Sequence, residues 1–256
     1  MRKTVLTIAA ASSLVFATAG AFAAELKVYV SGAMAHALEE ISKDFVKKNG
    51  HTLDFVVGTT GVLQDRVRKG EKADVIEVTS VGMDQLEKEK LILPGSRTEI
   101  AHALIGVAVR EGAPVPDIST AEALKRTLLG ARSITFVNSR SGGQVSVNLR
   151  AMLDRLGITD EVTKKTTFTI TGEEAIQRVV KGESEIVLAF VSEILPVKGA
   201  KWLGPMPAGL QFPTSYSAAI GAGSANPELA RALIAAIRNA EGRRIISNAG
   251  LEPVEH

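Results

Sequence analysis

The chain has 256 residues, of which 45% are hydrophobic and 23% are charged, so it has enough apolar material for one large core or two ordinary ones. With 30 Lys and Arg against 28 Asp and Glu, the formal net charge is only +2; we expect no nucleic-acid partner, because such proteins depend on many phosphate contacts. The absence of cysteine excludes disulfides, thiolate metal sites and cysteine nucleophiles.

Residues 1–23 have the pattern of a cleavable signal peptide. Arg2 and Lys3 precede an uncharged apolar stretch from Val5 to Phe16, and a small-residue A-x-A sequence ends at Ala23. The apolar stretch is shorter than the roughly 20 residues of a membrane-spanning helix, which argues against the alternative of an N-terminal anchor. Without Arg2 and Lys3, basic residues equal the 28 acidic ones. We therefore expect a neutral mature protein, exported to a Gram-negative periplasm.

From residue 25 onward, short apolar runs alternate with amphipathic stretches, which predicts an α/β fold with a largely parallel sheet. The two sets of strand and helix units suggest two lobes of about 100 residues each. A Gly/Pro-rich stretch at 199–213 contains no predicted element. The predicted strands cover 26–30, 53–57, 74–78, 104–109, 134–137, 168–170, 185–189 and 216–220, with helices at 34–49, around 63–67, at 81–90, around 120–129, and at 142–157, 171–180 and 226–237.

The sequence lacks the local motifs of common enzymes. It has no G-x-S-x-G elbow, no G-x-x-x-x-G-K-[ST] loop and no H-E-x-x-H helix. The histidines, at positions 36, 51, 102 and 256, are too scattered to form a local metal-ligand pair. We therefore expect no enzyme activity, no catalytic residue, no metal and no cofactor. A secreted α/β enzyme acting through His36 and a serine is the alternative class.

Small polar and glycine clusters fall at three predicted strand-to-helix junctions. At such junctions the first amide groups of a helix lack intrahelical partners and the helix dipole is positive, so an anion can bind there. Each cluster alone is also compatible with an ordinary helix cap, but three together, one with an arginine, favour a binding site at the carboxyl ends of the strands. The clusters are Ser31-Gly32-Ala33, Gly58-Thr59-Thr60-Gly61 and Ser139-Arg140-Ser141-Gly142-Gly143-Gln144.

Five segments carry a resemblance to a known family: VYVSGAMAHALEEISKDFVKKNG at 28–50, VVGTTGVLQDRVRKGEKADV at 56–75, GMDQLEKEKLI at 82–92, SGGQVSVNLRAMLDRLGI at 141–158 and NAGLEPV at 248–254. They resemble the molybdate-binding type of periplasmic solute-binding protein, the capture subunit of an ABC importer. This resemblance covers nearly the whole mature chain.

The resemblance implies a two-lobed type II periplasmic-binding-protein fold, or Venus flytrap, with two strands crossing between the lobes near 104–109 and 214–220. Lobe one is expected to contain residues 24–103 and 214–256, and lobe two residues 104–213. A small anionic ligand would bind in the cleft between them, and closure would present both lobes to the importer's transmembrane permease. We expect the protein to act as a monomer.

The resemblance also assigns positions in the ligand site. The serine of the family's first loop falls at Ala33, and a tyrosine that often donates its phenol falls at Phe190, so two hydroxyls are lost. The hydroxyl of the second loop is retained at Thr60. Arg140 stands beside the third loop, and a guanidinium matches planar carboxylates well. We therefore expect a small organic carboxylate, with molybdate or tungstate as the alternative.

The expected roles within this site follow from the donor groups. Thr60 and Ser141 would donate hydroxyls, Gly143 an amide and Arg140 its charge, while Phe190 would close one wall. Arg140 could instead be a solvated loop residue. The full expected ligand-binding set is Ser31, Gly32, Ala33, Thr59, Thr60, Arg140, Ser141, Gly142, Gly143, Gln144 and Phe190.

Overall fold

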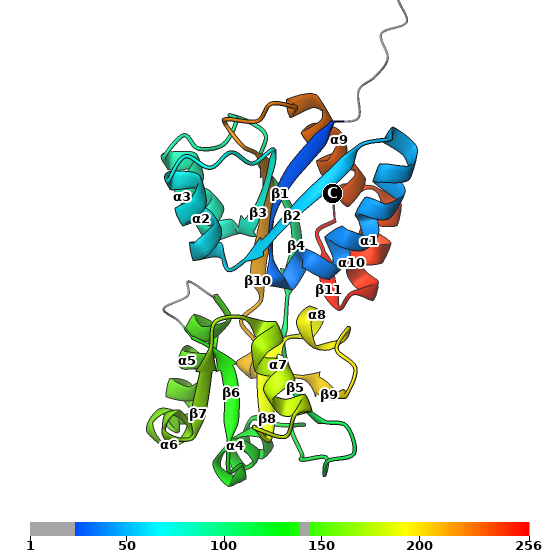
Figure 1. Cartoon of the computed structure of the whole chain (residues 1–256). Helices are drawn as coiled ribbons and strands as arrows, with labels where there is room; N and C mark the ends of the chain where they lie inside the picture. The colour runs from blue at the N-terminus through cyan, green and yellow to red at the C-terminus, as the bar shows by residue number, and fades with distance from the viewer. Residues whose placement is uncertain (1–23, 139–143, 256) are drawn as a thin grey trace, which may run out of the picture.

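The computed structural model describes residues 24–138 and 144–255, so the predicted signal segment lies outside the described residues. These residues form two β-sheets, each flanked by helices, one above the other in the view of Figure 1. No described helix is both long and apolar enough to span a bilayer.

The strands of the first sheet are β1 (Glu25–Ser31), β2 (Thr52–Gly58), β3 (Val75–Thr79), β4 (Thr98–Ala103), β10 (Thr214–Ile220) and β11 (Leu251–Pro253). Their order is β11-β4-β10-β3-β1-β2. β1 pairs in parallel with β2 and β3, whereas β10 runs antiparallel to β3 and β4, and β11 antiparallel to β4. The sheet therefore combines strands from both ends of the chain.

The strands of the second sheet are β5 (Ile105–Arg110), β6 (Ile134–Val137), β7 (Thr166–Thr169), β8 (Ile186–Phe190) and β9 (Ala200–Pro205), in the order β7-β6-β8-β5-β9. β6 is parallel to β7 and β8, while β5 is antiparallel to β8 and β9. The prediction of a largely parallel sheet is thus wrong. Both sheets are mixed because the chain enters the other sheet at Leu104 and again after 206–213. The strand that follows each crossing, β5 and then β10, runs antiparallel to both of its neighbours.

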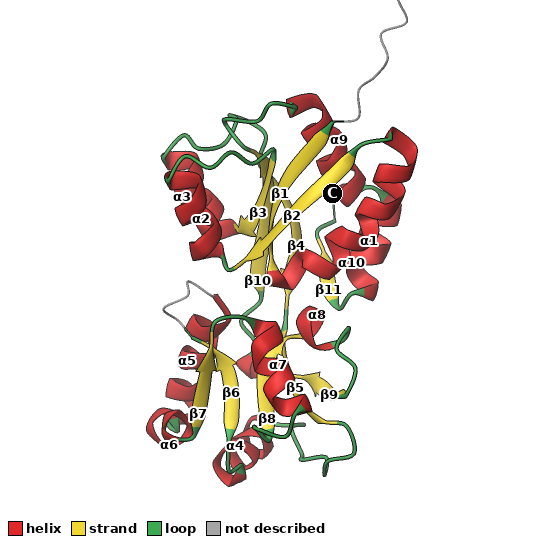
Figure 2. Ribbon diagram, in the orientation of Figure 1, coloured by secondary structure: helices red, strands yellow, loops and turns green. Residues whose placement is uncertain are grey.

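The helices are α1 (Gly32–Asn49), α2 (Thr60–Arg68), α3 (Ser80–Lys88), α4 (Ala121–Gly130), α5 (Gln144–Leu156), α6 (Thr159–Lys164), α7 (Gly172–Val180), α8 (Val191–Ile194), α9 (Pro227–Arg238) and α10 (Ala240–Asn248), with a 3₁₀ turn at Ala208–Leu210. In Figure 2, α2 and α3 cover one face of the first sheet, and α1, α9 and α10 cover the other.

Side chains of β1 alternate between two apolar cores. Val28 and Val30 belong to the large core shared with α1, α9 and α10, whereas Tyr29 belongs to the smaller core formed with α2 and α3. This follows from the two-residue period of a strand. Because both faces are covered, the strand reads as a nearly continuous apolar run, which is the signal that predicts it.

The ends of the helices agree with local sequence signals. Gly50 ends α1 in the left-handed region at φ 68°, and its amide donates to the Val46 carbonyl, as expected of a glycine C-cap. Before α7, the Thr171 hydroxyl accepts the amide of Glu174 at 3.2 Å. The structure adds elements that the sequence analysis missed, namely β4, β9, β11, α6, α8 and α10. Most of them are short or carry polar residues, so their apolar periodicity is weak.

Candidate functional site

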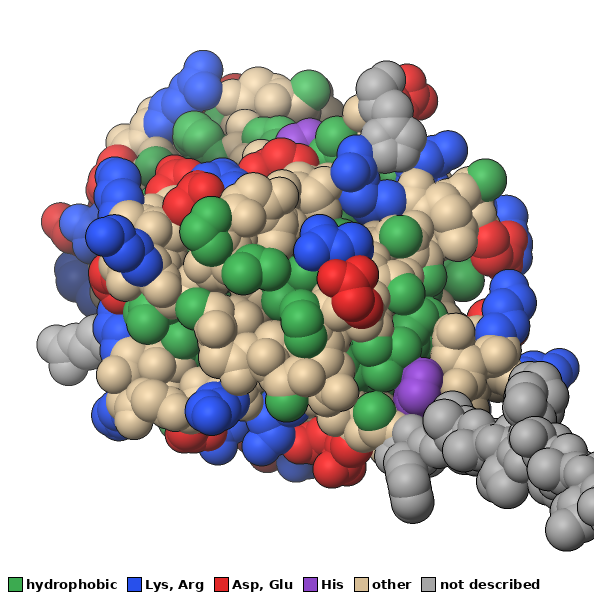
Figure 3. Space-filling view, turned by 90° about the horizontal axis from the view of Figure 1, so that it is seen from above, with side chains coloured by type: hydrophobic (Ala, Val, Ile, Leu, Met, Phe, Trp, Pro, Cys, Tyr) green, Lys and Arg blue, Asp and Glu red, His purple; other side chains and the backbone are tan. Residues whose placement is uncertain are grey.

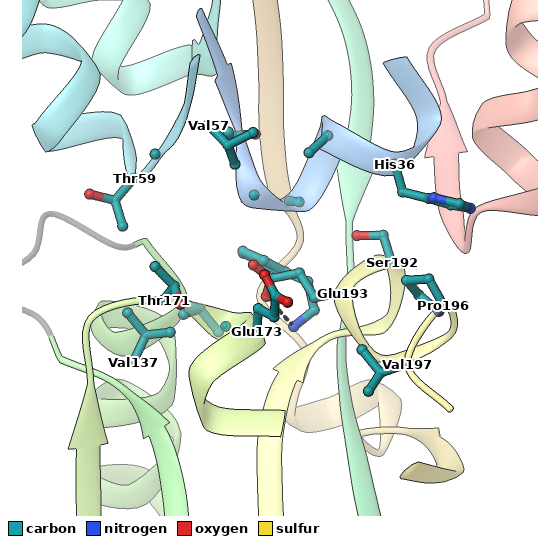
Figure 4. A pocket seen from close by; sticks show the side chains of 18 of the residues that line it. His36, Val57, Thr59, Val137, Thr171, Glu173, Ser192, Glu193, Pro196 and Val197 are labelled. Carbon is teal, nitrogen blue, oxygen red and sulfur yellow. Dashed lines mark hydrogen bonds between the residues drawn. The ribbon is translucent and has the colours of Figure 1, made fainter. Parts of the chain in front are cut away.

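A cleft of about 730 Å³ lies between the two sheets, and both contribute residues to it (Figure 4). The first-sheet side contributes the end of β1, the start of α1, the turn before α2 and Tyr216 of β10. The second-sheet side contributes the end of β6, the start of α7, and β8 with α8. The volume falls in the range of roughly 300–1,000 Å³ that is typical of small-molecule sites.

Several helices begin at this cleft. Gly32 opens α1, Thr60 opens α2 and Gly172 opens α7, and all three line the cavity. Thr79, the N-cap of α3, lines it as well. Amide groups in the first turn of a helix have no intrahelical partners and lie at the positive end of the helix dipole. The arrangement therefore directs positive ends of helices from both sheets at one space.

The N-cap of α1 differs from its neighbours. The hydroxyls of Thr59, Thr79 and Thr171 each accept an amide from their own helix. Ser31 makes no such cap: its hydroxyl donates to the carboxyl group of Glu77 at 3.2 Å, and its amide donates there at 2.7 Å. The first turn of α1 consequently lacks a side-chain cap at the point where it meets the cleft.

Glu77 and Tyr216 form a buried polar floor beneath Ser31. Burial raises the pKa of Glu77 to about 8, although both hydrogen bonds from Ser31 act in the opposite direction. The Tyr216 hydroxyl is hydrogen-bonded to Ser31, and burial, with added repulsion from Glu77 and Glu193, raises the pKa of that phenol well above 10.0. At neutral pH the floor therefore holds a neutral phenol and a largely protonated carboxyl group.

Glu193 extends from α8 toward the cleft centre (Figure 4). Its carboxyl accepts the amide of Phe190 at 3.3 Å, and burial raises its pKa to about 7, with that hydrogen bond as the smaller, opposing cause. A Cβ on Gly32 would lie 2.8 Å from its Oε1, and a Cβ on Gly172 would lie 2.5 Å from the same atom. Glycines at the starts of α1 and α7 thus leave the space that this carboxyl group occupies.

Two further side chains complete the described walls. Ser192 is only 3% exposed, and its hydroxyl has no hydrogen-bond partner within residues 24–138 and 144–255. Lys198 supplies the one Lys or Arg side chain among the described lining residues. In the same described part, no group of three or more histidine and acidic residues could hold a metal ion.

Six residues of the predicted site surround this cleft. Ser31, Gly32, Ala33, Thr59, Thr60 and Phe190 line it. The Thr60 hydroxyl accepts the amide of Thr79 at 3.2 Å, which leaves its own hydrogen available to a ligand. Phe190 packs edge-to-face on Tyr216, with ring centroids 6.1 Å apart, and so forms an apolar wall.

The third predicted cluster is not described by the structure. Arg140, Ser141, Gly142 and Gly143 lie outside the described residues, and of Gln144 only its place as the first residue of α5 is described. Val137 and Val145, which lie on either side of this segment in the sequence, both line the cleft.

The sequence analysis missed the acidic and phenolic members of the site. A helix was predicted to begin at Thr171, and its position after a predicted strand was a usable signal for a fourth anion-binding junction. Glu193 and Tyr216 carried no such signal, since one follows an apolar strand by three residues and the other lies within a strand. His36, proposed in the enzyme alternative, lines the cleft, but no hydrogen bond joins it to a serine within the described chain.

The face of the molecule at the end that carries the first sheet has charges of both signs. Positive and negative side chains are interspersed on it (Figure 3). An anion in the cleft would be attracted by local groups, above all the helix N-termini.

Comparison with known proteins places this geometry in context. A family model described as "Bacterial extracellular solute-binding protein" matches residues 26–252. An aconitate isomerase of a Pseudomonas species is 30% identical over 234 residues, covering 90% of this chain and 88% of that protein. A molybdate-binding protein of Mycobacterium bovis is 25% identical over 231 residues, covering 89% and 84%.

Solved structures agree with the fold. The periplasmic molybdate-binding protein of Azotobacter vinelandii superposes with a TM-score of 0.77 at 21% identity, covering 90% of this chain and 99% of that one. The sulfate-binding protein SubI of Mycobacterium tuberculosis gives a TM-score of 0.72 at 15% identity, covering 91% and 88%. The predicted two-lobed type II fold is thereby confirmed.

Proposed function

Since the chain belongs to the family of bacterial extracellular solute-binding proteins, we propose that it captures a small organic polycarboxylate in the cleft and delivers it to the permease of an ABC importer. The observation that carries this proposal is the convergence of α1 and α2 from one sheet and α7 from the other on a single cavity. Helix N-termini from both sides can bind the separate carboxylates of one ligand.

Three features favour a polycarboxylate over molybdate or tungstate. Ala33 and Phe190 line the cleft at positions where the molybdate-binding type has hydroxyl donors, and neither side chain can donate. Glu193 adds an acid to a site that, for a tetrahedral oxyanion, is expected to consist of neutral donors. Among the relatives, the one named for aconitate, a tricarboxylate, has the higher identity, 30% against 25% for those named for molybdate.

The mode of action that we propose is hinge closure. Residues 24–103 and 214–256 would move as one lobe and residues 104–213 as the other, about the segments at Leu104 and 206–213 that join the sheets. Arg140, which lies between Val137 and Val145 in the sequence, would contribute a guanidinium to one ligand carboxylate. The signal peptide would direct the protein to the periplasm, where it would act as a monomer.

A ligand screen on the mature protein tests this proposal. Thermal shifts with cis- and trans-aconitate, citrate and the saturated analogue tricarballylate are compared with shifts from molybdate, tungstate and sulfate. A ligand at about 100 times its Kd adds roughly 2.7 kcal/mol of apparent stability. Tighter binding of molybdate than of every organic acid would overturn the carboxylate proposal.

The contribution of Arg140 is tested by calorimetry. Arg140→Ala is expected to weaken the best polycarboxylate at least tenfold, because it removes a charge-assisted hydrogen bond worth about 1.5–3 kcal/mol. The control is Arg150→Ala, which removes an exposed arginine of α5 that is paired with Asp154. Equal affinities of Arg140→Ala and the unmodified protein would assign Arg140 to the solvated loop.

A second candidate function is isomerisation of the captured acid. It is favoured by the 30% identity to an aconitate isomerase over 90% of the chain. Proton transfer needs an acid or base open to the substrate, and Glu193 in the cleft meets that requirement. Incubating the protein with cis-aconitate and following the trans isomer by proton NMR tests it. Turnover that is lost in Glu193→Gln would establish an enzyme, and no interconversion would leave a binding protein.

A further inference from the structure

Glu193 occupies an unusual position for a carboxyl group in a protein that binds anions. It lies between the first residues of α1 and α7, and so between the two sheets, in contact with Gly32 and Gly172. Its described hydrogen bonding is limited to the amide of Phe190, the residue that precedes its own helix, at 3.3 Å. No described Lys, Arg or His forms an ion pair with it. The acid therefore faces the ligand space with capacity for another hydrogen bond.

The surroundings of Glu193 do not favour its ionised form. Its carboxyl is enclosed by protein, and this desolvation disfavours the ionised form more than the hydrogen bond from the Phe190 amide favours it. The positive ends of α1 and α7 also lie beside it and act in the opposite direction to desolvation. The titratable groups that line or underlie the cleft with it are His36 and Glu39 on α1, Glu77 on β3, Glu173 on α7, Tyr216 on β10, and Lys198 after α8.

We propose that Glu193 is a ligand-binding residue that shares one proton with a carboxylate of the bound ligand, so that capture above neutral pH takes up a proton from solvent. This inference rests on the proposed function, because it needs a carboxylate ligand. Two carboxyl groups in contact cannot both ionise without strong repulsion, but one proton between them makes a strong hydrogen bond. Ser192, from the same helix, also lines the cleft, and its buried hydroxyl has no hydrogen-bond partner in the part of the chain that the structure describes.

The expected consequence is a characteristic pH dependence. Burial raises the pKa of Glu193 to about 7 in the free protein, so the carboxyl is already protonated in mildly acidic solution and binding there needs no added proton. Above that pH the free protein ionises, and the proton must be restored on binding. Apparent affinity should then fall roughly tenfold for each pH unit.

Calorimetry measures the proton directly. Binding of tricarballylate and trans-aconitate is titrated at about pH 8 in buffers of different ionisation enthalpy, where the acids are fully ionised and any proton taken up belongs to the complex. The mature wild-type protein is expected to take up close to one proton per ligand. Glu193→Gln retains a hydrogen-bond donor but cannot titrate, so its uptake should be close to zero and its affinity nearly constant with pH.

Two variants separate Glu193 from other acids. Glu161→Gln changes an exposed acid on α6, away from the cleft, and should retain wild-type proton uptake. Glu77→Gln changes the other carboxyl with a raised pKa. Uptake that disappears in Glu77→Gln but persists in Glu193→Gln would overturn the inference.

The outcomes distinguish this inference from the function on which it rests. Polycarboxylate binding with no proton uptake by the wild-type protein refutes the role of Glu193 and leaves the proposed function intact. Failure of every organic acid to bind refutes both. Because the wild-type measurement needs no variant, the test does not depend on whether Glu193→Gln folds.

Discussion

Alanine at Gly172 provides a test of whether this glycine serves the site or the fold. The new Cβ would lie 2.5 Å from Glu193 Oε1, closer than real Cβ atoms approach a neighbour, so the carboxyl must move. The new Cβ would contact only the end of the flexible Glu193 side chain, which can rotate away. Alanine is otherwise a better helix former than glycine by about 0.5–1 kcal/mol. We therefore expect Gly172→Ala to change the free energy of unfolding by less than about 1 kcal/mol.

The effect on the ligand should be larger than the effect on stability. Displacing Glu193 removes a hydrogen bond that we assign to the ligand, worth about 1.5 kcal/mol, so tricarballylate should bind roughly tenfold more weakly. Urea unfolding and calorimetry on the same preparation give both quantities. The expected signature of Gly172→Ala is therefore a protein of normal stability with a weakened site.

Gly242 is the matched control, since it also lies in the first turn of a helix. A Cβ there would overlap the backbone carbonyl oxygens of Ala236 and Ile237, which no side-chain rotation can relieve. Gly242→Ala should therefore destabilise the fold by about 2–3 kcal/mol, as overpacking does, and leave affinity unchanged in the folded fraction. If Gly172→Ala is destabilised as much as Gly242→Ala, or binds normally, the reasoning about Glu193 fails.

Two further predictions concern the buried polar groups. The pKa of Glu77 is near 4.5 in the unfolded chain and about 8 in the folded protein, so the folded protein binds more protons between these values. Stability should therefore fall as pH rises through this range, by on the order of 1 kcal/mol per pH unit. Glu77→Gln should make that fall less steep in thermal unfolding, and an unchanged slope would contradict the assignment. Thr60→Val removes the acceptor of the Thr79 amide and a hydroxyl that we expect to donate to the ligand, so it should cost about 1–3 kcal/mol of stability and at least tenfold in affinity. Thr60→Ser retains the hydroxyl and should keep both. Equal affinities of the two variants in calorimetry would show that the hydroxyl does not contact the ligand.

Local patterns in the sequence were sufficient for most of the fold. The run at 26–30 and the helix that ends at Gly50 depend on neighbours within a few residues, and each was predicted within two residues. β9 was missed because the Gly/Pro-rich stretch at 199–213 has little strand signal, and its pairing with β5 comes from a distant part of the chain. The antiparallel strands likewise follow from the crossings between sheets, which no local pattern encodes.

The candidate site likewise contains residues that the sequence could place and residues that it could not. Ser31 and Thr60 could be predicted to share a cleft because both follow strands, and carboxyl ends of parallel strands meet at one edge of a sheet. Glu193 could not, because its importance depends on contact with the first residues of two helices more than 20 residues away in sequence. Arg140, on which the preference for a carboxylate first rested, lies outside the described residues.

The uncapped start of α1 connects folding with binding. A serine at this position normally accepts an amide of its own helix, which stabilises the helix by about 1 kcal/mol. Here the hydroxyl of Ser31 donates instead to Glu77, a buried carboxyl with a raised pKa that also accepts the amide of Ser31. The amides of α1 are left for a group that arrives from solution. The anion that we propose for the cleft would complete the missing cap of α1, and the stabilisation that it gives to α1 would be part of its binding free energy.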